Sequence, residues 1–387
     1  MAEPLAGVVV VSLEQAVAAP FATRQLADLG ATVIKIERPG GDFARAYDRD
    51  VNGMSTHFAW TNRGKHSVVL DLKDAGDRGT FDELVAGADV FVHNIAPSAA
   101  QRLGLDPSLM RSKDAGLIAC VISGYGAGGP ISDSKAYDLA VQAEAGAFSL
   151  SGHSEPGRVG FAAADVAAGM YAFSGILAAL YAREQTGEGA TIEVAMLDSL
   201  VEWLSAQLYS AHYSGAPVPR TGRRHPGIAP YGTFATADGR SVLVAVQNDR
   251  EWAMFATQVL DDADLADDPR FRTNPDRIAH VVEVEALVAA RLSGLDRGRA
   301  VSLLQAAGIA VADVNELADV WDHPQLRARD RFLTVDSPVG PVELLAPPLG
   351  RRDGAVMGIP AIGQHDPRVI ADVVARGRAR RDDPPSA

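Results

Sequence analysis

Short runs of β-branched residues alternate with helix-like segments through the first third of the chain, and this alternation constrains the fold most. The runs GVVVVSLE, ATVIKIERP, HSVVLDLK, ADVFVHN and GLIACVIS predict about five strands. An Ala/Leu-rich stretch from Pro20 to Leu29 and a polar segment at Asp74–Ala86 predict helices between them. Strands that alternate with helices pair in parallel, so the sequence predicts an α/β fold with a mostly parallel sheet.

Parallel sheets bind ligands beyond the carboxyl ends of their strands. The sequence places Glu37-Arg38-Pro39, Asn94 and Ser123-Gly124-Tyr125 at those ends. The loop after the first strand has no G-x-G-x-x-G, and no P-loop motif occurs, so the sequence does not support a nicotinamide, flavin or P-loop site. The segment GYGAGGP at 124–130 is compatible with a flexible turn and with an active-site lid or anion nest.

Composition limits the classes of partner. A chain of 387 residues with 47% hydrophobic content is long enough for two globular domains. Its net charge of −13 argues against a nucleic-acid partner, although a local basic pocket could still bind a phosphorylated small molecule.

The single cysteine, Cys120, excludes an internal disulfide and a thiolate zinc site, and we predict no metal site. We interpret Cys120 as a buried strand residue. The start of the chain lacks a basic segment before its short apolar run, and no window of about 20 apolar residues is evident. We therefore expect a cytoplasmic protein that does not enter the membrane.

A long Gly/Pro/Arg-rich loop, GAPVPRTGRRHPGIAP, predicts a domain boundary. Before it, we expect a helix from Asp165 to about Arg183, a stop at Gly187, a strand in ATIEVAML and a helix at about Asp198–Tyr213. After it, a β-hairpin turning at Asp238-Gly239 and a helix-rich region predict a small α+β unit. The expected organisation is a large Rossmann-like domain (1–200 and 329–387), a linker (201–224) and a small domain (225–328).

One acidic residue, Asp165, interrupts the small apolar run FAAADVAAGMYAFSGIL. It could be a helix N-cap, whose carboxylate accepts a first-turn N–H and contributes about 1 kcal/mol. It could also be a carboxylate nucleophile, kept ionised by the helix dipole and open to a bulky electrophile because its neighbours are small. The pattern alone leaves both interpretations open, and they are compatible.

Six stretches, in order over residues 4–199, resemble the class III CoA-transferase family, the CaiB/BaiF type that includes formyl-CoA transferase, carnitine CoA-transferase and α-methylacyl-CoA racemases. The C-terminal third matches more loosely. The resemblance implies an interlocked homodimer, acyl-CoA and a small carboxylic acid as substrates, and no permanently bound cofactor. The stretches are PLAGVVVVSLEQAVAAPFATRQLADLGATVIKIERPGGDFAR, ADVFVHNIAPSAAQRLGL, ISGYGAGGP, KAYDLAVQAEAG, ADVAAGMYAFSGILAALYARE and TGEGATIEVAMLDS.

The resemblance implies that Asp165, in the motif A-D-x-x-x-G, is the nucleophile. It would attack the donor thioester to give a mixed anhydride, which the CoA thiolate would convert into an aspartyl-CoA thioester; the incoming carboxylate would reverse these steps. The glycine-rich loop 124–130 is expected to supply backbone donors and to exclude water. Formyl-CoA transferase has a glutamine where Val17 stands, so Gln15 could replace its oxyanion contact.

The same resemblance assigns side chains to the CoA site. Tyr137, in SKAYD, would pack or donate a hydrogen bond near the thioester. Racemases of the family have a histidine at this position, because racemisation needs two opposed bases; tyrosine therefore argues against racemisation. The other expected CoA contacts are Arg38 and Lys135 for phosphate, Asn94 for an amide or the adenine, Val17, and as weaker phosphate candidates Lys73 and Arg102.

The stretches LEQAVAAP and ERPGGDFARAYD resemble family members that act on itaconate, mesaconate, citramalate or malate, usually with succinyl-CoA as donor. The second carboxylate of such an acid needs a cation, and the loop PRTGRRHPGIAPYG could be a carboxylate clamp or a solvated basic loop. The alternative functions are an acyl-CoA racemase or epimerase and a non-catalytic CoA-binding protein. The candidate cations are Arg45, Arg220, Arg223, Arg224 and His225.

Overall fold

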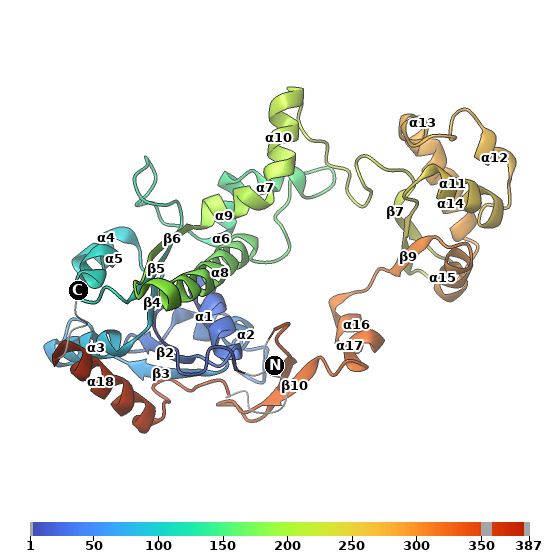
Figure 1. The fold of residues 1–387 in the computed structure, drawn as a ribbon. Coiled ribbons are helices and arrows are strands. Elements are labelled where there is room, and N and C mark those ends of the chain that lie inside the picture. The colour runs from blue at the N-terminus through green and yellow to red at the C-terminus, as the bar shows by residue number, and fades with distance from the viewer. Residues whose placement is uncertain (1–2, 350–357, 383–387) are drawn as a thin grey trace. The chain divides into compact units, whose positions relative to one another are not determined.

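The computed structural model describes residues 3–349 and 358–382. Six parallel strands form one sheet in the order β3-β2-β1-β4-β5-β6, which confirms the predicted parallel α/β fold (Figure 1). This is the strand order of doubly wound nucleotide-binding folds, and it reverses between β1 and β4. The strands are β1 (Val9–Leu13), β2 (Thr32–Glu37), β3 (Lys65–Val69), β4 (Val90–His93), β5 (Ile118–Ser123) and β6 (Thr191–Ala195).

Helices cover both faces of this sheet, which explains why its strands are apolar on both sides. Val10 belongs to the core shared with α1 (Ala18–Asp28) and α8 (Ala163–Thr186). Its neighbours Val9 and Val11 belong to the opposite core, together with side chains of α3 (Ala75–Gly87) and α18 (Pro367–Asp382). Helix α18 returns from the C-terminal end of the chain and packs against α3 (Figure 1).

Cys120 is buried in β5, as predicted, and burial raises the pKa of its thiol to about 12. The single helix predicted at Asp198–Tyr213 is wrong, because the backbone leaves helical geometry at Leu204 (φ −98°, ψ 4°) and two helices form. The other elements around the sheet are η1 (Phe43–Ala46), α2 (Thr56–Asn62), α4 (Pro97–Arg102), α5 (Pro107–Arg111), α6 (Asp138–Glu144), α7 (Ala147–Leu150), α9 (Met196–Trp203), α10 (Ser205–Ser214), β10 (Phe332–Val335) and β11 (Val342–Leu345).

The chain divides into two compact units, one of residues 1–148, 158–216 and 326–387 and a smaller one of residues 149–157 and 217–325. The smaller unit contains the predicted hairpin, with Gly239 at φ 75° in its turn. The domain bounds 225–328 and the linker 201–224 stay predictions. The elements of the second half are β7 (Tyr231–Ala235), β8 (Ser241–Ala245), α11 (Asp249–Gln258), α12 (Asp264–Asp267), α13 (Asn274–Ala279), α14 (Val281–Leu292), α15 (Arg297–Ala306), β9 (Ala310–Asp313), α16 (Leu317–Trp321) and α17 (Pro324–Arg327).

Helix α8 corrects the expectation that no segment is long and apolar enough to cross a membrane. Its 24 residues meet that criterion by length and composition. Its small side chains, including Ala164, Ala168 and Ala172, are buried in the core beside α1 and the sheet, which is typical of the central helix of a globular unit. The cytoplasmic location stays a prediction.

Candidate active site

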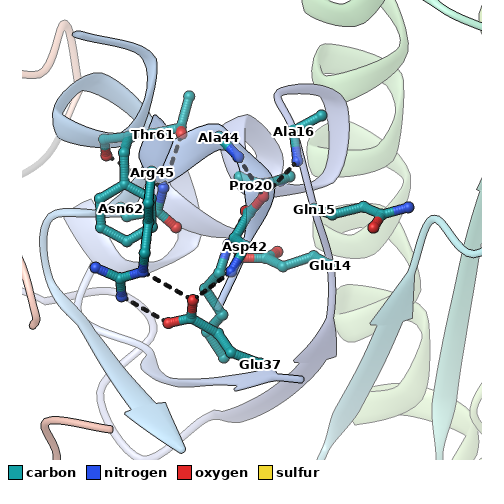
Figure 2. Close-up of polar contacts among 12 residues, drawn as sticks. Glu14, Gln15, Ala16, Pro20, Glu37, Asp42, Ala44, Arg45, Thr61 and Asn62 are labelled. Atoms are coloured by element: carbon teal, nitrogen blue, oxygen red, sulfur yellow. Dashed lines mark hydrogen bonds and ion pairs between the residues drawn. The ribbon is translucent and has the colours of Figure 1, made fainter. Parts of the chain in front are cut away.

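The loops that follow β1 and β4 are joined at the point where the strand order reverses. The backbone N–H of Gln15 donates to Oδ1 of Asn94 (3.0 Å), and Nδ2 of Asn94 donates to the Gln15 carbonyl (2.8 Å). The side chain of Asn94 is therefore engaged in holding the loop before α1. The side chain of Gln15 is partly buried and points away from Asp42 and Glu37 (Figure 2).

The next residue, Ala16, has a left-handed backbone conformation (φ 63°). This conformation is uncommon for a residue with a side chain, so the surrounding structure has to hold it. Oδ1 of Asp42 accepts hydrogen bonds from the N–H groups of Ala16 (3.2 Å) and Ala44 (2.9 Å) (Figure 2). Oδ2 accepts one from Nζ of Lys35 (2.7 Å). These bonds fix the direction in which α1 starts.

Two fully buried lysines form ion pairs with the acidic residues of this region. Nζ of Lys65 lies 2.6 Å from Oε1 of Glu14, and Nζ of Lys35 lies 3.7 Å from the same oxygen. Thr23 donates to the other oxygen of Glu14 (2.6 Å). Burial, only partly offset by Glu14, lowers the pKa of Lys65 to about 7. Because these charges are buried and paired with one another, we assign them a structural role.

Arg45, a candidate cation for the acceptor acid, is occupied by Glu37. Nη2 of Arg45 lies 2.6 Å from Oε1 of Glu37, and Nε lies 2.9 Å from Oε2. The guanidinium also donates to the Pro360 carbonyl (3.2 Å) and lies 3.7 Å from the ring centroid of Phe58. Although burial disfavours the charge of Glu37, Arg45 and Lys35 lower its pKa to about 2. This pairing argues against the predicted role of Arg45.

The structure excludes one of the two interpretations of Asp165 and leaves the other a prediction. Helix α8 begins at Ala163, so Asp165 is its third residue, and the N-cap interpretation is wrong. The capping oxygen instead comes from Asp138, the first residue of α6. Its Oδ1 accepts hydrogen bonds from the N–H groups of Ala164 (2.8 Å) and Asp165 (3.4 Å). The carboxylate of Asp165 therefore does not cap its own helix.

The carboxylate of Asp165 lies at the start of α1. The N–H of Ala18, the first residue of α1, donates toward this carboxylate and favours its ionised form. Burial and the nearby Asp138 carboxylate outweigh that effect and raise the pKa of Asp165 to about 7. Gly169, one turn further along α8, has no side chain to keep α1 away: a Cβ there would lie 2.8 Å from the Ala18 carbonyl oxygen. This contact explains the glycine of A-D-x-x-x-G.

Two tyrosines belong to the same surroundings. Burial, together with Asp42, Asp165 and Tyr137, raises the pKa of Tyr47 to about 12, so its phenol stays protonated and can donate a hydrogen bond. Tyr47 and Tyr137 are 46% and 63% exposed, which leaves both accessible to a ligand. Sequence reasoning missed Tyr47 and Asp138. Neither forms a motif of its own, although ARAYD and KAYD are among the stretches that carried the resemblance.

The cations predicted for CoA phosphates have exposed side chains. Nε of Arg38, just after β2, donates to the Gly41 carbonyl (3.1 Å). Lys135 lies two residues before Tyr137. Lys73 lies in the loop after β3 and Arg102 in the last turn of α4. The described contacts bring Gln15, Val17, Asn94 and Asp165 together around the start of α1; they do not join Lys73 or Arg102 to that group.

The glycine-rich loop 124–130 begins against the segment that carries Tyr137. A Cβ at Gly124 would lie 2.0 Å from Cβ of Ala136, so only glycine fits at this close approach. Residues 127–130 are exposed. The proposed roles of this loop, as a lid and as a source of backbone donors, stay predictions.

The remaining candidate cations, Arg220, Arg223, Arg224 and His225, belong to the smaller unit. Arg220 donates to the carbonyls of Ser149 (3.4 Å), His153 (3.5 Å) and Ser154 (3.2 Å). His225 stacks on the ring of Tyr231, with ring centroids 5.1 Å apart. The predicted carboxylate clamp in this loop stays a prediction.

Fold and site together define a Rossmann-type α/β protein with an elevated-pKa carboxylate held against the start of a helix. The chain belongs to CoA-transferase family III, which it matches over residues 5–366, and it is a CoA-transferase by this membership. The predicted family is therefore confirmed.

Curated relatives and solved structures extend over nearly the whole chain. An acetyl-CoA:oxalate CoA-transferase of Acetobacter aceti is 36% identical, with 88% of this chain and 89% of the relative covered. A succinate–glutarate CoA-transferase of Agrobacterium fabrum is 33% identical, with 96% of each covered. The crystal structure of a CaiB/BaiF family protein from Brucella suis superposes with a TM-score of 0.85 at 32% identity, covering 96% of this chain and 100% of that one.

Proposed function

We propose that this enzyme transfers CoA from succinyl-CoA to a small dicarboxylic acid such as itaconate, mesaconate, citramalate or malate, with Asp165 as the nucleophile. The observation that carries the proposal is the carboxylate of Asp165, which has a pKa near 7 and faces the Ala18 N–H. Relatives named as mesaconate and D-citramalate CoA-transferases, 33% and 28% identical to this chain, support the substrate class.

In the proposed reaction, a carboxylate oxygen of Asp165 attacks the donor thioester carbonyl, and the C–S bond breaks to release CoA thiolate. The thiolate attacks the aspartyl carbonyl of the resulting mixed anhydride, the donor acid leaves, and an aspartyl-CoA thioester remains. The acceptor carboxylate attacks this thioester, and its C–S bond breaks to release CoA thiolate and leave a new mixed anhydride. The thiolate then attacks the acceptor acyl carbonyl, and the Asp165 carboxylate is the leaving group. Product acyl-CoA leaves and Asp165 is regenerated, with no net uptake of water or protons.

The start of α1 suits the charge that develops in these steps. Each addition places a negative charge on a carbonyl oxygen near Asp165, and a helix N-terminus with free N–H groups stabilises such a charge. The N-cap residue Val17 provides no side-chain hydrogen bond, so the Ala18 N–H is not occupied by its own helix cap. The phenols of Tyr47 and Tyr137 are further donors for the substrate.

The proposal is tested by offering the enzyme succinyl-CoA and each acid of a panel of itaconate, mesaconate, citramalate, malate, glutarate and oxalate. Mass spectrometry should detect a new acyl-CoA with one of the first four acids. If an acyl-CoA product formed only with glutarate or oxalate, the proposed acceptor acids would be wrong, although the CoA transfer would stand. Exchange of the substrate's α-proton for deuterium in deuterated solvent, without acyl transfer, would support the racemase alternative instead.

The pH dependence of aspartyl adduct formation is a separate prediction. The pKa of Asp165 is raised to about 7, so the carboxyl is protonated and unreactive below this pH. We expect the single-turnover rate to rise about tenfold per pH unit below the midpoint and to level off above it. A rate that stays level between about pH 5 and pH 9 would contradict the assignment.

We also propose that the enzyme is a homodimer, interlocked as the family resemblance implies. Every residue of α10 is partly or fully exposed, and Tyr209 and Tyr213 are 57% and 84% exposed. A short helix without buried residues has little stability of its own, so a covering partner is expected. Sedimentation should give twice the chain mass of 40.7 kDa. The double substitution Tyr209→Glu and Tyr213→Glu should reduce this mass, whereas Val282→Glu, at a side chain of α14 that is 77% exposed, should not. A wild-type monomer at micromolar concentration would contradict the proposal.

A further inference from the structure

Asp138 bonds to the first turn of the helix that carries Asp165, although 27 residues separate the two. Its Oδ1 accepts hydrogen bonds from the backbone N–H groups of Ala164 (2.8 Å) and Asp165 (3.4 Å). Its other oxygen accepts a bond from Nε2 of Gln142 (2.7 Å). Both oxygens of this carboxylate are therefore used inside the protein rather than offered to a ligand.

Gln142 extends the same network to the segment before α8. It is fully buried, its Nε2 also donates to the Phe161 carbonyl (3.1 Å), and its Oε1 accepts the N–H of Val159 (2.9 Å). Asp138 and Gln142 thus hold both the helix start and the chain that leads into it. The hydrogen bonds of these two side chains together fix the position and direction of the first turn of α8.

The charge of Asp138 also acts on Asp165. Two carboxylates in one site disfavour each other's ionisation. Burial and this neighbour together raise the pKa of Asp165 to about 7, and burial raises the pKa of Asp138 as well. A less acidic carboxylate is the stronger nucleophile, provided that it is ionised at the working pH.

We propose that Asp138 is the positioning residue for the Asp165 nucleophile: it fixes the first turn of α8 through two backbone N–H groups, and its negative charge acts on the Asp165 carboxylate. The inference rests on the proposed function in that it takes Asp165 as the reacting group. It assigns a role to Asp138, the aspartate of KAYD, which was not among the predicted site residues.

Other ionisable groups lie on the elements around the same pair. Tyr47 and Tyr137 interact with each other, and Tyr47 with Asp165. Arg158, before α8, favours the ionised form of Asp138. The further ionisable side chains on elements packed against α8 are Arg24 and Asp28 of α1, Cys120 of β5, Glu144 of α6, Glu193 of β6, and Asp198 and Glu202 of α9.

Asp138→Asn separates the two effects, because the amide keeps an oxygen for the Ala164 N–H but loses the charge. The carboxyl resonance of Asp165, identified by its loss in Asp165→Asn, is titrated by NMR in wild type and variant. Adduct formation with succinyl-CoA is measured over the same pH range. We expect both midpoints to fall by about one pH unit, which raises the ionised fraction below the midpoint about tenfold.

Asp138→Ala, which also removes the capping oxygen, should lower the plateau rate by a further tenfold or so, since misplacing a reacting group by a small distance has a large cost. The matched control is Asp106→Asn, which alters a cap on α5 through the N–H groups of Ser108 and Leu109 and should leave both midpoints unchanged. An unchanged Asp165 midpoint in Asp138→Asn overturns the inference. If the Asp165 midpoint falls in Asp138→Asn as expected but wild type forms no adduct with succinyl-CoA, the proposed function is overturned instead.

Discussion

Replacing Asp165 with asparagine is expected to reduce CoA transfer by about 10⁴-fold, as removal of a covalent nucleophile does in other enzymes. The amide has no ionised oxygen to attack the thioester and cannot form the mixed anhydride. Steady-state transfer and the intact protein mass after incubation with succinyl-CoA measure the two losses. Asp198→Asn is the matched control, because Asp198 is also the third residue of its helix but is exposed. An adduct that persists in Asp165→Asn would remove Asp165 from the mechanism.

The same variant should be more stable than wild type above neutral pH, which distinguishes lost chemistry from misfolding. The folded-state pKa of Asp165, about 7, lies above its ordinary value of 3.8. Between these values the folded protein binds more protons than the unfolded chain, so this group lowers stability as pH rises toward 7. Asparagine removes that penalty. The Tm gain should be largest above about pH 7 and should vanish near pH 4.

Replacing Gly169 with alanine has the second largest expected effect. A Cβ there would lie 2.8 Å from the Ala18 carbonyl oxygen and 2.8 Å from Cδ1 of Phe21, so α1 or α8 must shift. Such overpacking costs about 1–3 kcal/mol of unfolding free energy. Because the shift displaces the Ala18 N–H from Asp165, we expect the adduct-forming rate to fall about 100-fold. Thermal unfolding and single-turnover rates measure both effects.

Gly175→Ala is the control for this experiment. It lies on the same helix, where a Cβ would meet only the Ile192 side chain, with Cγ2 at 3.2 Å, and no backbone atom of α1. The higher helix propensity of alanine should leave that variant active and no less stable. If Gly169→Ala matched Gly175→Ala in rate and in Tm, the close approach of α1 to α8 would have no part in catalysis.

The parts of the fold that depend on local periodicity could be predicted from the sequence. The β-branched runs between helical segments identified the parallel sheet, and Cys120 was expected inside it. Helix α8 was found, but its start was placed at Asp165 because a carboxylate before an apolar run resembles an N-cap. Its length and hydropathy, sufficient for a membrane span, were overlooked, and the burial of its alanines beside α1 became visible only in the structure.

By itself, the sequence determined the parallel α/β architecture and the family, and it supplied Asp165 as the candidate nucleophile, because each rests on residues close together in the chain. Only the tertiary structure decided that Asp138 caps α8, that the Ala18 N–H faces Asp165, that Asn94 holds the Gln15 backbone, and that Arg45 is paired with Glu37. The physical reason is that hydrogen bonds and charges act through space. A residue's partner, and with it the residue's pKa, depends on which distant segments folding brings within a few ångströms.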